Sequence, residues 1–114
     1  MQDCVFCKIA NGEIKPKIVY RGGDVIAFED INPKAPIHII IIPKKHIGRI
    51  SDARDAEAGL IGKLFLVANK LARVKRVASS GYRLVVNCNK DAGQEVFHLH
   101  LHLLGGRKFT WPPG

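Results

Sequence analysis

The stretch VFHLHLHLL, residues 96–104, places three of the chain's five histidines, His98, His100 and His102, at every second position of an apolar run. In a β-strand successive side chains point to opposite faces, so the three rings share one face and the leucines between them share the other. The strict alternation favours a strand over a helix, which would spread the same rings around its cylinder. Imidazole has an unperturbed pKa of about 6.5, so rings arranged in this way could hold a metal ion jointly or supply a neutral nucleophile.

The cysteines carry a second signal, because Cys4 and Cys7 form a Cys-x-x-Cys pair while Cys88 stands alone. An odd count argues against a disulfide scaffold. Two thiolates lack only two nitrogen ligands to complete a tetrahedral zinc site, and histidines are the natural candidates. The same spacing can be a redox motif beside a βαβ unit, but an antiparallel hairpin follows it here. An incidental pair of buried thiols explains the bare motif equally well.

The elements that must position these side chains follow from periodicity and turn residues. Cys4 to Ala10 is predicted to be a short helix, and a long helix is predicted from the caps Ser51 and Asp52 to about Val77. Five strands are predicted at Ile18 to Arg21, Val25 to Glu29, Ile37 to Pro43, Tyr82 to Val86 and Val96 to Leu104. The pattern predicts an α+β fold, an antiparallel sheet with a helix packed on it.

Size and composition are those of one globular domain, expected to span residues 1–114. Hydrophobic residues make up 46% and charged residues 25% of the chain, with no repeat or low-complexity tract. The longest apolar run, Ile37 to Ile42, is too short to cross a bilayer, and the N-terminus lacks a signal-peptide pattern. We therefore expect a cytoplasmic protein with no membrane partner.

The formal net charge of +8 raises the question of nucleic-acid binding. The basic residues are scattered, with only short groups such as Lys44-Lys45, and no helix-turn-helix, zinc-finger or RNA-recognition signature accompanies them. A solvated surface is the favoured interpretation, and no nucleic-acid partner is expected. The charge could still attract an anionic small substrate.

Three segments resemble the histidine triad (HIT) superfamily, in its Hint branch: INPKAPIHIIIIPKKHI at 31–47, GQEVFHLHLHLLGGR at 93–107, and the ending WPPG. The family pattern is His-φ-His-φ-His-φ-φ, where φ is apolar, and residues 98–104 fill it completely. Gly105-Gly106-Arg107 and WPPG point to Hint rather than to the dinucleoside polyphosphate hydrolases of the Fhit branch. The resemblance covers nearly the whole chain and implies a HIT-like domain of five antiparallel strands, one long and one short helix.

The resemblance implies roles for the histidines. It places the nucleophile at His100, which would attack an α-phosphorus. The bond formed between the ring nitrogen and phosphorus is labile, and water would then hydrolyse it. His102 would hydrogen-bond the phosphoryl oxygens as charge develops. His38 aligns with a position beside the catalytic histidines, although a lone histidine on an apolar strand is more often a hydrogen-bonded core residue.

Further positions align with family residues that bind the substrate. Asn87 aligns with a residue that binds phosphate or ribose, and Gln94 with one near the leaving group. Glu95 occupies a position where many Hint relatives carry serine, so only its backbone N–H would serve there. Asp30 aligns with the carboxylate that accepts from both ribose hydroxyls. The apolar walls around the purine would be Phe6, Ile9, Phe28 and Ile31, for each of which core packing is a nearly equal interpretation.

The resemblance also implies a structural zinc ion and a symmetric homodimer. Relatives that keep the Cys-x-x-Cys pair complete the site with two histidines, so the ligands here would be Cys4, Cys7, His46 and His98. Four protein ligands close the coordination shell, and such a metal is structural. Hint relatives pair across a two-fold axis by extending the sheet, which would place Trp111 near the partner's active site.

Together these features predict a purine nucleoside phosphoramidase of the adenosine 5′-monophosphoramidase type, acting through a nucleotidyl-His100 intermediate on a purine nucleoside phosphoramidate and releasing the monophosphate. One alternative is a nucleotide-binding regulatory or interaction module with incidental catalysis, and another is a dinucleoside polyphosphate hydrolase. A further alternative is a catalytic metal held jointly by the three histidines of residues 98–102.

Overall fold

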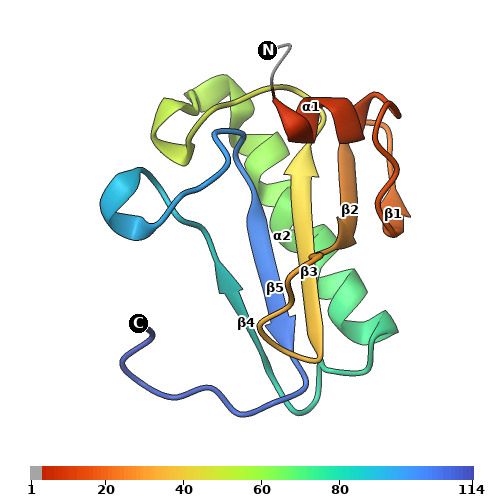
Figure 1. Ribbon diagram of the computed structural model, residues 1–114, viewed down its shortest axis with the longest axis vertical. Coiled ribbons are helices and arrows are strands. Elements are labelled where there is room, and N and C mark those ends of the chain that lie inside the picture. Colours follow the sequence, from red (N-terminus) through yellow and green to blue (C-terminus); the bar gives the residue numbers. More distant parts are fainter. Residues whose placement is uncertain (1–3) are drawn as a thin grey trace.

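The computed structural model describes residues 4–114 and contains one antiparallel sheet with the spatial order β1-β2-β3-β5-β4 (Figure 1). The strands are β1 (Ile18–Arg21), β2 (Val25–Glu29), β3 (Ile37–Pro43), β4 (Tyr82–Val85) and β5 (Leu101–Gly105). The helices are α1 (Val5–Ala10) and α2 (Ala58–Val74), with 3₁₀ turns at Ile50–Asp52, Asp55–Glu57 and Lys90–Ala92. Among the described residues, no helix combines the length and the apolar character that a membrane span requires.

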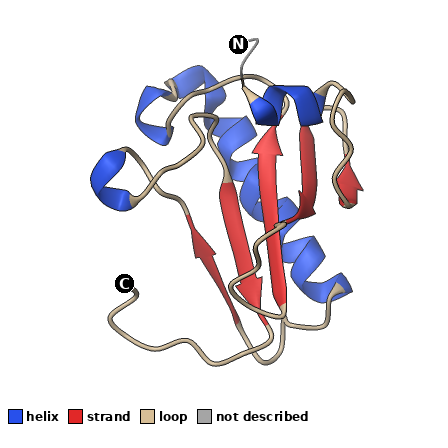
Figure 2. Ribbon diagram, in the orientation of Figure 1, coloured by secondary structure: helices blue, strands red, loops and turns tan. Residues whose placement is uncertain are grey.

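The two faces of the sheet bury different sets of side chains, because successive residues of a strand point in opposite directions. In β3, Ile39 and Ile41 face α2 and join a core with its Leu64, Val67 and Leu71. Figure 2 shows this long helix lying behind the sheet. The leucines of the histidine run belong to the same core, so the period of two predicted for them is observed.

The opposite face of the sheet is covered by α1, which lies over the ends of β2 and β3 (Figure 1). Its Phe6 and Ile9 pack with Phe28, Ile40 and Ile42 in a second, smaller core. Phe6 and Phe28 meet edge to face with ring centroids 5.5 Å apart. The cysteines on either side of Phe6 are thereby held against the sheet.

The long helix is shorter at both ends than predicted. Ser51 and Asp52 lie in a 3₁₀ turn instead of capping α2, which begins only at Ala58. The carboxylate of Glu57 accepts a hydrogen bond from the backbone N–H of Arg54 (2.8 Å), which gives this donor a partner in the turn that precedes the helix. At the other end, Arg76 adopts a left-handed conformation with φ 62°, and the prediction of helix to Val77 is wrong.

A Schellman motif explains the C-terminal end of α2. The N–H of Val77 donates to the carbonyl of Ala72 (2.9 Å) and that of Arg76 to the carbonyl of Arg73 (3.1 Å). These are the bonds that close such a motif, in which the left-handed residue is usually glycine. No glycine marks this position, so the sequence pattern gave no stop signal.

The last strand also begins later than predicted, at Leu101 instead of Val96. Ladder pairing between β3 and β5 stops at the pair Ile41 and Leu101, close to Pro43, which has no N–H to donate. The segment before Leu101 forms backbone hydrogen bonds outside the β3 ladder, since the N–H of Leu99 donates to the carbonyl of Ile47 (2.6 Å). Residues 96–100 are therefore irregular, although their side chains still alternate between the two faces. β4 likewise ends one residue early, at Val85.

The turn after β5 supports a stability prediction. Gly106 has φ +90°, and a Cβ added there would lie 2.9 Å from Cβ of Pro36. We expect Gly106→Ala to lower the free energy of unfolding by about 2–4 kcal/mol, from left-handed strain plus steric overlap. Gly12→Ala is the matched control, because Gly12 has φ +87° with nothing within 4 Å of the added Cβ, and it should cost only about 1–2 kcal/mol. Urea unfolding measures both, and equal losses would contradict the steric contribution.

Candidate active site

The three histidines at residues 98–102 all lie on the α1 side of the sheet. His98 and His100 are buried in the segment before β5, and His102 is half-buried within it. The Phe6 ring contacts His100 edge to face at a centroid distance of 5.1 Å. The rings of His100 and His102 are 4.9 Å apart. The alternation thus brings the rings together even though only one of them lies in a regular strand.

The hydrogen bond of His100 determines which ring nitrogen is free. Nδ1 of His100 lies 2.7 Å from the carbonyl oxygen of His98. Because a carbonyl oxygen can only accept, Nδ1 carries the proton and Nε2 of the neutral ring keeps its lone pair. Burial lowers the pKa of His100 below its ordinary value, so the ring is neutral at pH 7. A neutral imidazole with a bare Nε2 is a competent nucleophile.

His38 on β3 belongs to a chain of hydrogen bonds that reaches His102. The backbone N–H of Lys34 donates to Nδ1 of His38 (3.0 Å), so the proton of the neutral His38 ring is on Nε2. That Nε2 lies 2.9 Å from Nδ1 of His102 and 3.3 Å from Oδ2 of Asp30. When Nε2–H of His38 donates to His102, the proton of His102 must be on its own Nε2, ready to donate to a ligand.

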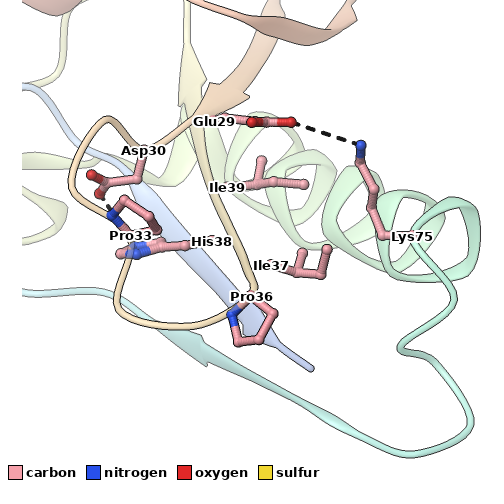
Figure 3. A pocket seen from close by; sticks show the side chains of 8 residues that line it. All are labelled: Glu29, Asp30, Pro33, Pro36, Ile37, His38, Ile39 and Lys75. Carbon is pink, nitrogen blue, oxygen red and sulfur yellow. Dashed lines mark ion pairs between the residues drawn. The ribbon is translucent and has the colours of Figure 1, made fainter. Parts of the chain in front are cut away.

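Asp30 stands at the start of the loop that joins β2 to β3, and Figure 3 shows its carboxylate facing His38. Its Oδ1 accepts from the backbone N–H of Asn32 (2.7 Å), which fixes the side chain in an Asx turn. Burial is the main cause that lowers the pKa of His38, and the carboxylate of Asp30 opposes it only partly. The contact is therefore between a carboxylate and a neutral ring. Figure 3 draws the side chains that line a small hollow of about 90 Å³, which include Asp30 and His38 but not His100.

Asp30, His38 and His102 lie close enough together to be considered as metal ligands. The hydrogen bond from Lys34 argues against this role. If Nδ1 of His38 accepts a hydrogen bond and Nε2 binds a metal, the ring would have to lose both protons. Within residues 4–114, no cluster with metal-ligand spacing contains all three histidines of residues 98–102, so the arrangement does not support a jointly held catalytic metal.

The position of His102 leads to a prediction of how stability depends on pH. Burial, reinforced by the neighbouring His100 and His38, lowers the pKa of His102 to about 4. Because the unfolded chain takes up this proton at about pH 6.5, the unfolded state binds more protons between these values. The free energy of unfolding should therefore fall as the pH drops from 6.5 towards 4, and this group should contribute no change above 6.5. Urea unfolding at pH 7 and pH 5 should show a smaller drop for His102→Gln than for the unaltered chain; an equal drop would contradict the assignment.

A cavity of about 340 Å³ opens beside the histidines. Seven residues predicted to contact nucleotide line it: Phe6, Asp30, Ile31, Asn87, Glu95, His100 and His102. They come from α1, the β2–β3 loop, the segment after β4 and the histidine run. Ile31 is 99% exposed, an unusual position for a large apolar side chain and one that leaves it available to a ligand.

Other predicted residues lie outside this cavity. Ile9 and Phe28 are buried in the smaller core and are not among the residues that line the cavity. Gln94 is buried, with its amide bonded to the backbone of Asn89, Gly48 and Val96, and it holds the loop before the histidines.

The cavity also contains Asn32, Ile40, Gly93 and Val96, which sequence reasoning missed. Of these four, only Ile40 could have been predicted from the sequence, because it lies two residues from His38 and shares its face of β3.

The second candidate site joins α1 to the histidine run. Sγ of Cys4 lies 3.3 Å from Nδ1 of His98, and Sγ of Cys7 lies 3.3 Å from Nδ1 of His46. All four ligand atoms are within 4.8 Å of one another, so these side chains lie close enough to hold a metal ion. Nε2 of His98 lies 2.8 Å from the carbonyl oxygen of Pro43 and must donate to it, so Nδ1 keeps the lone pair that faces the thiols.

This donor set suits zinc. Ligand atoms about 2.0–2.3 Å from a tetrahedral ion are about 3.3–3.8 Å apart, and the sulfur-to-nitrogen distances here are 3.3, 3.3 and 3.5 Å. Without a metal, burial raises the pKa of Cys7 to about 11, with Cys4 as the next cause, so a metal would have to displace the thiol proton.

Known proteins of similar sequence and structure belong to one family. A family model described as the HIT domain matches residues 11–109. An uncharacterized HIT-like protein of Synechocystis sp. is 45% identical over 113 residues, which cover 99% of this chain and 98% of that protein. The crystal structure of a HIT family hydrolase from Legionella pneumophila matches with a TM-score of 0.97 at 52% identity, covering 98% of this chain and 100% of that one. A histidine triad protein from Clostridium difficile matches with a TM-score of 0.94 at 46% identity, covering 96% of each chain.

Proposed function

Since the chain belongs to the HIT domain family, we propose that it is a nucleotide hydrolase of the Hint type, which cleaves the phosphorus–nitrogen bond of purine nucleoside 5′-phosphoramidates. The observation that carries the proposal is the bare Nε2 of His100 in a cavity that also contains Asp30. The similar Legionella pneumophila protein is described as a hydrolase, which supports the reaction class.

The reaction would proceed in two displacements at phosphorus. In the first, Nε2 of His100 forms a bond to the α-phosphorus while the bond to the amine nitrogen breaks, and the amine leaves with a proton taken from solvent. In the second, water attacks phosphorus and gives a proton to solvent, the bond to Nε2 breaks, and the nucleoside monophosphate is released. His102, with its proton on Nε2, would donate to a phosphoryl oxygen as negative charge develops.

The nucleoside would be held by the loop after β2 and by α1. The Asp30 carboxylate can accept from both ribose hydroxyls, because each of its oxygens has a lone pair beyond the bonds described above. Phe6, Ile31 and Ile40 give the cavity the apolar surface that a purine needs. Asn87 would contact phosphate or ribose from the segment after β4.

Steady-state assays separate this proposal from its alternatives. The purified protein should release AMP from adenosine 5′-phosphoramidate faster than it cleaves diadenosine triphosphate. AMP binding without measurable turnover would favour the nucleotide-binding module, and preferential cleavage of the dinucleotide would favour a polyphosphate hydrolase.

We also propose that Cys4, Cys7, His46 and His98 hold a structural zinc ion. The support is the donor spacing, together with the lone pair of His98 that faces the thiols. The ion would supply no chemistry to the reaction, because four protein ligands leave no open coordination position. Reduced thiols suit the cytoplasm, which is the compartment we propose.

A homodimer is the third part of the proposal. Strands β1 and β4 are the two edges of the sheet, and an edge left unpaired is a liability that pairing removes. Trp111 is 82% exposed, as expected of a side chain that contacts a partner. Sedimentation at micromolar concentration should give about twice the chain mass of 12.6 kDa. A monomer under these conditions would refute the dimer.

A further inference from the structure

The cavity that contains His100 shares part of its wall with a neighbouring hollow. Glu95 and Val96 line it, and the same two residues line a second hollow of about 360 Å³, whose other walls are Cys4, Val5 and Phe97. The two hollows therefore adjoin the same short piece of chain, immediately before the histidine run. A molecule whose phosphorus lies at His100 can extend past Glu95 into the second hollow.

Two apolar side chains in the wall of the second hollow, Val5 and Phe97, are accessible. Val5 is 39% and Phe97 51% exposed, whereas Phe6, between the two cysteines, is buried against the histidines. A phenylalanine ring that keeps half its surface in water beside a cavity offers a contact for an apolar ligand group. Neither Val5 nor Phe97 belongs to the two cores formed within the described part of the chain.

The junction of the two hollows carries a negative charge in a chain whose net charge is +8. Glu95 is exposed, and within residues 4–114 no ion pair joins its carboxylate to a basic side chain. Asp30, the other acidic residue of the first cavity, already uses one oxygen to hold the turn at Asn32. The Glu95 carboxylate is thus placed to meet a cation that approaches from the second hollow.

We infer that the second hollow is a leaving-group subsite, and that it selects amines with an apolar body and a distal positive charge. The inference rests on the proposed phosphoramidase function and specifies its substrate class. The nucleoside arm of the substrate lies towards Asp30 and Ile31, so the amine arm takes the side of Glu95. The apolar part of the amine contacts Phe97 and Val5. Its distal ammonium lies in the second hollow and pairs there with the carboxylate of Glu95, a residue that lines both hollows.

Three AMP phosphoramidates of equal chain length test the charge preference: those of 1,5-diaminopentane, pentylamine and 5-aminopentanoate. The unaltered protein should cleave them in the order cation, neutral, anion, with kcat/KM changing about two- to fivefold at each step, the range of an exposed ion pair. Glu95→Gln should make the three rates equal, and Glu95→Lys should reverse the order. Glu13→Gln is the matched control, because Glu13 is exposed and lines neither hollow, and it should keep the original ratios.

The apolar wall has its own test. Phe97→Ala should lower the ratio of kcat/KM for phenethylamine over methylamine phosphoramidates by about two- to fivefold, because the larger amine loses buried contact area. Equal rates for the three charged and neutral amines, or an order that Glu95→Lys leaves unchanged, would overturn the inference while the phosphoramidase function stands. Failure of the folded, unaltered protein to cleave any of these substrates would overturn the proposed function and the subsite with it.

Discussion

Replacing His100 by alanine is expected to lower kcat for adenosine 5′-phosphoramidate by about 10⁴–10⁶-fold, because it removes the proposed nucleophile. AMP affinity should stay within about threefold, since in the proposed binding mode ribose and base are held by Asp30, Phe6 and Ile31, which line the cavity. The His100→Ala variant would then bind AMP but lack the chemical step. Turnover is measured at steady state and AMP binding by calorimetry.

His102→Ala is the graded comparison for this prediction. His102 lines the same cavity and would lose one stabilising hydrogen bond, which typically costs about 10²–10³-fold. Mass spectrometry of the quenched unaltered enzyme should find a nucleotidylated peptide that contains His100, and no such peptide in His100→Ala. Near-normal turnover by His100→Ala would refute the mechanism.

The second large effect is expected from the zinc site. Protein purified under reducing conditions with zinc available should carry close to one zinc per chain, and Cys4→Ser or Cys7→Ser should lose most of it. Because the ion binds the folded state, free zinc at about 1,000 times its Kd adds about 4 kcal/mol to the free energy of unfolding. That increment should be missing from both variants.

Cys88→Ser provides the matched control for the zinc prediction. Cys88 contacts Ser51 and lies outside the cluster of Cys4, Cys7, His46 and His98, so its replacement should leave metal content unchanged. Elemental analysis measures the metal and urea unfolding the stability. An unaltered protein without zinc, or a Cys4→Ser protein that keeps its full metal content, would contradict the site.

The sequence predicted the sheet well where local patterns decide the structure. The bounds of β1, β2 and β3 are those predicted, because β-branched residues and turn residues mark them on both sides. The predicted ends of α2 and the predicted start of β5 were wrong, because the interactions that set them cannot be recognised from a local sequence pattern. Arg76 takes a position that usually belongs to glycine, and Pro43 ends the pairing of a distant strand.

The candidate site shows the same division between local and distant information. The alternation at residues 98–102 predicted which rings share a face, because that property is local. The approach of Asp30 and His38 to His102 depends on the pairing of β3 with β5, across more than 60 residues of sequence, and only the family resemblance indicated it. Likewise the packing of Phe28 against Ile9 in the smaller core depends on where α1 lies, which no local pattern contains.

The alternation of side chains from His98 to His102 also constrains how the protein can evolve. His98 belongs to the proposed metal cluster, and His100 and His102 line the proposed catalytic cavity. A single-residue insertion or deletion between them would turn every following side chain to the opposite face and put leucines where the imidazoles stand. Substitutions at the leucine positions change only the core on the α2 side. This segment can therefore accept substitutions but not insertions or deletions.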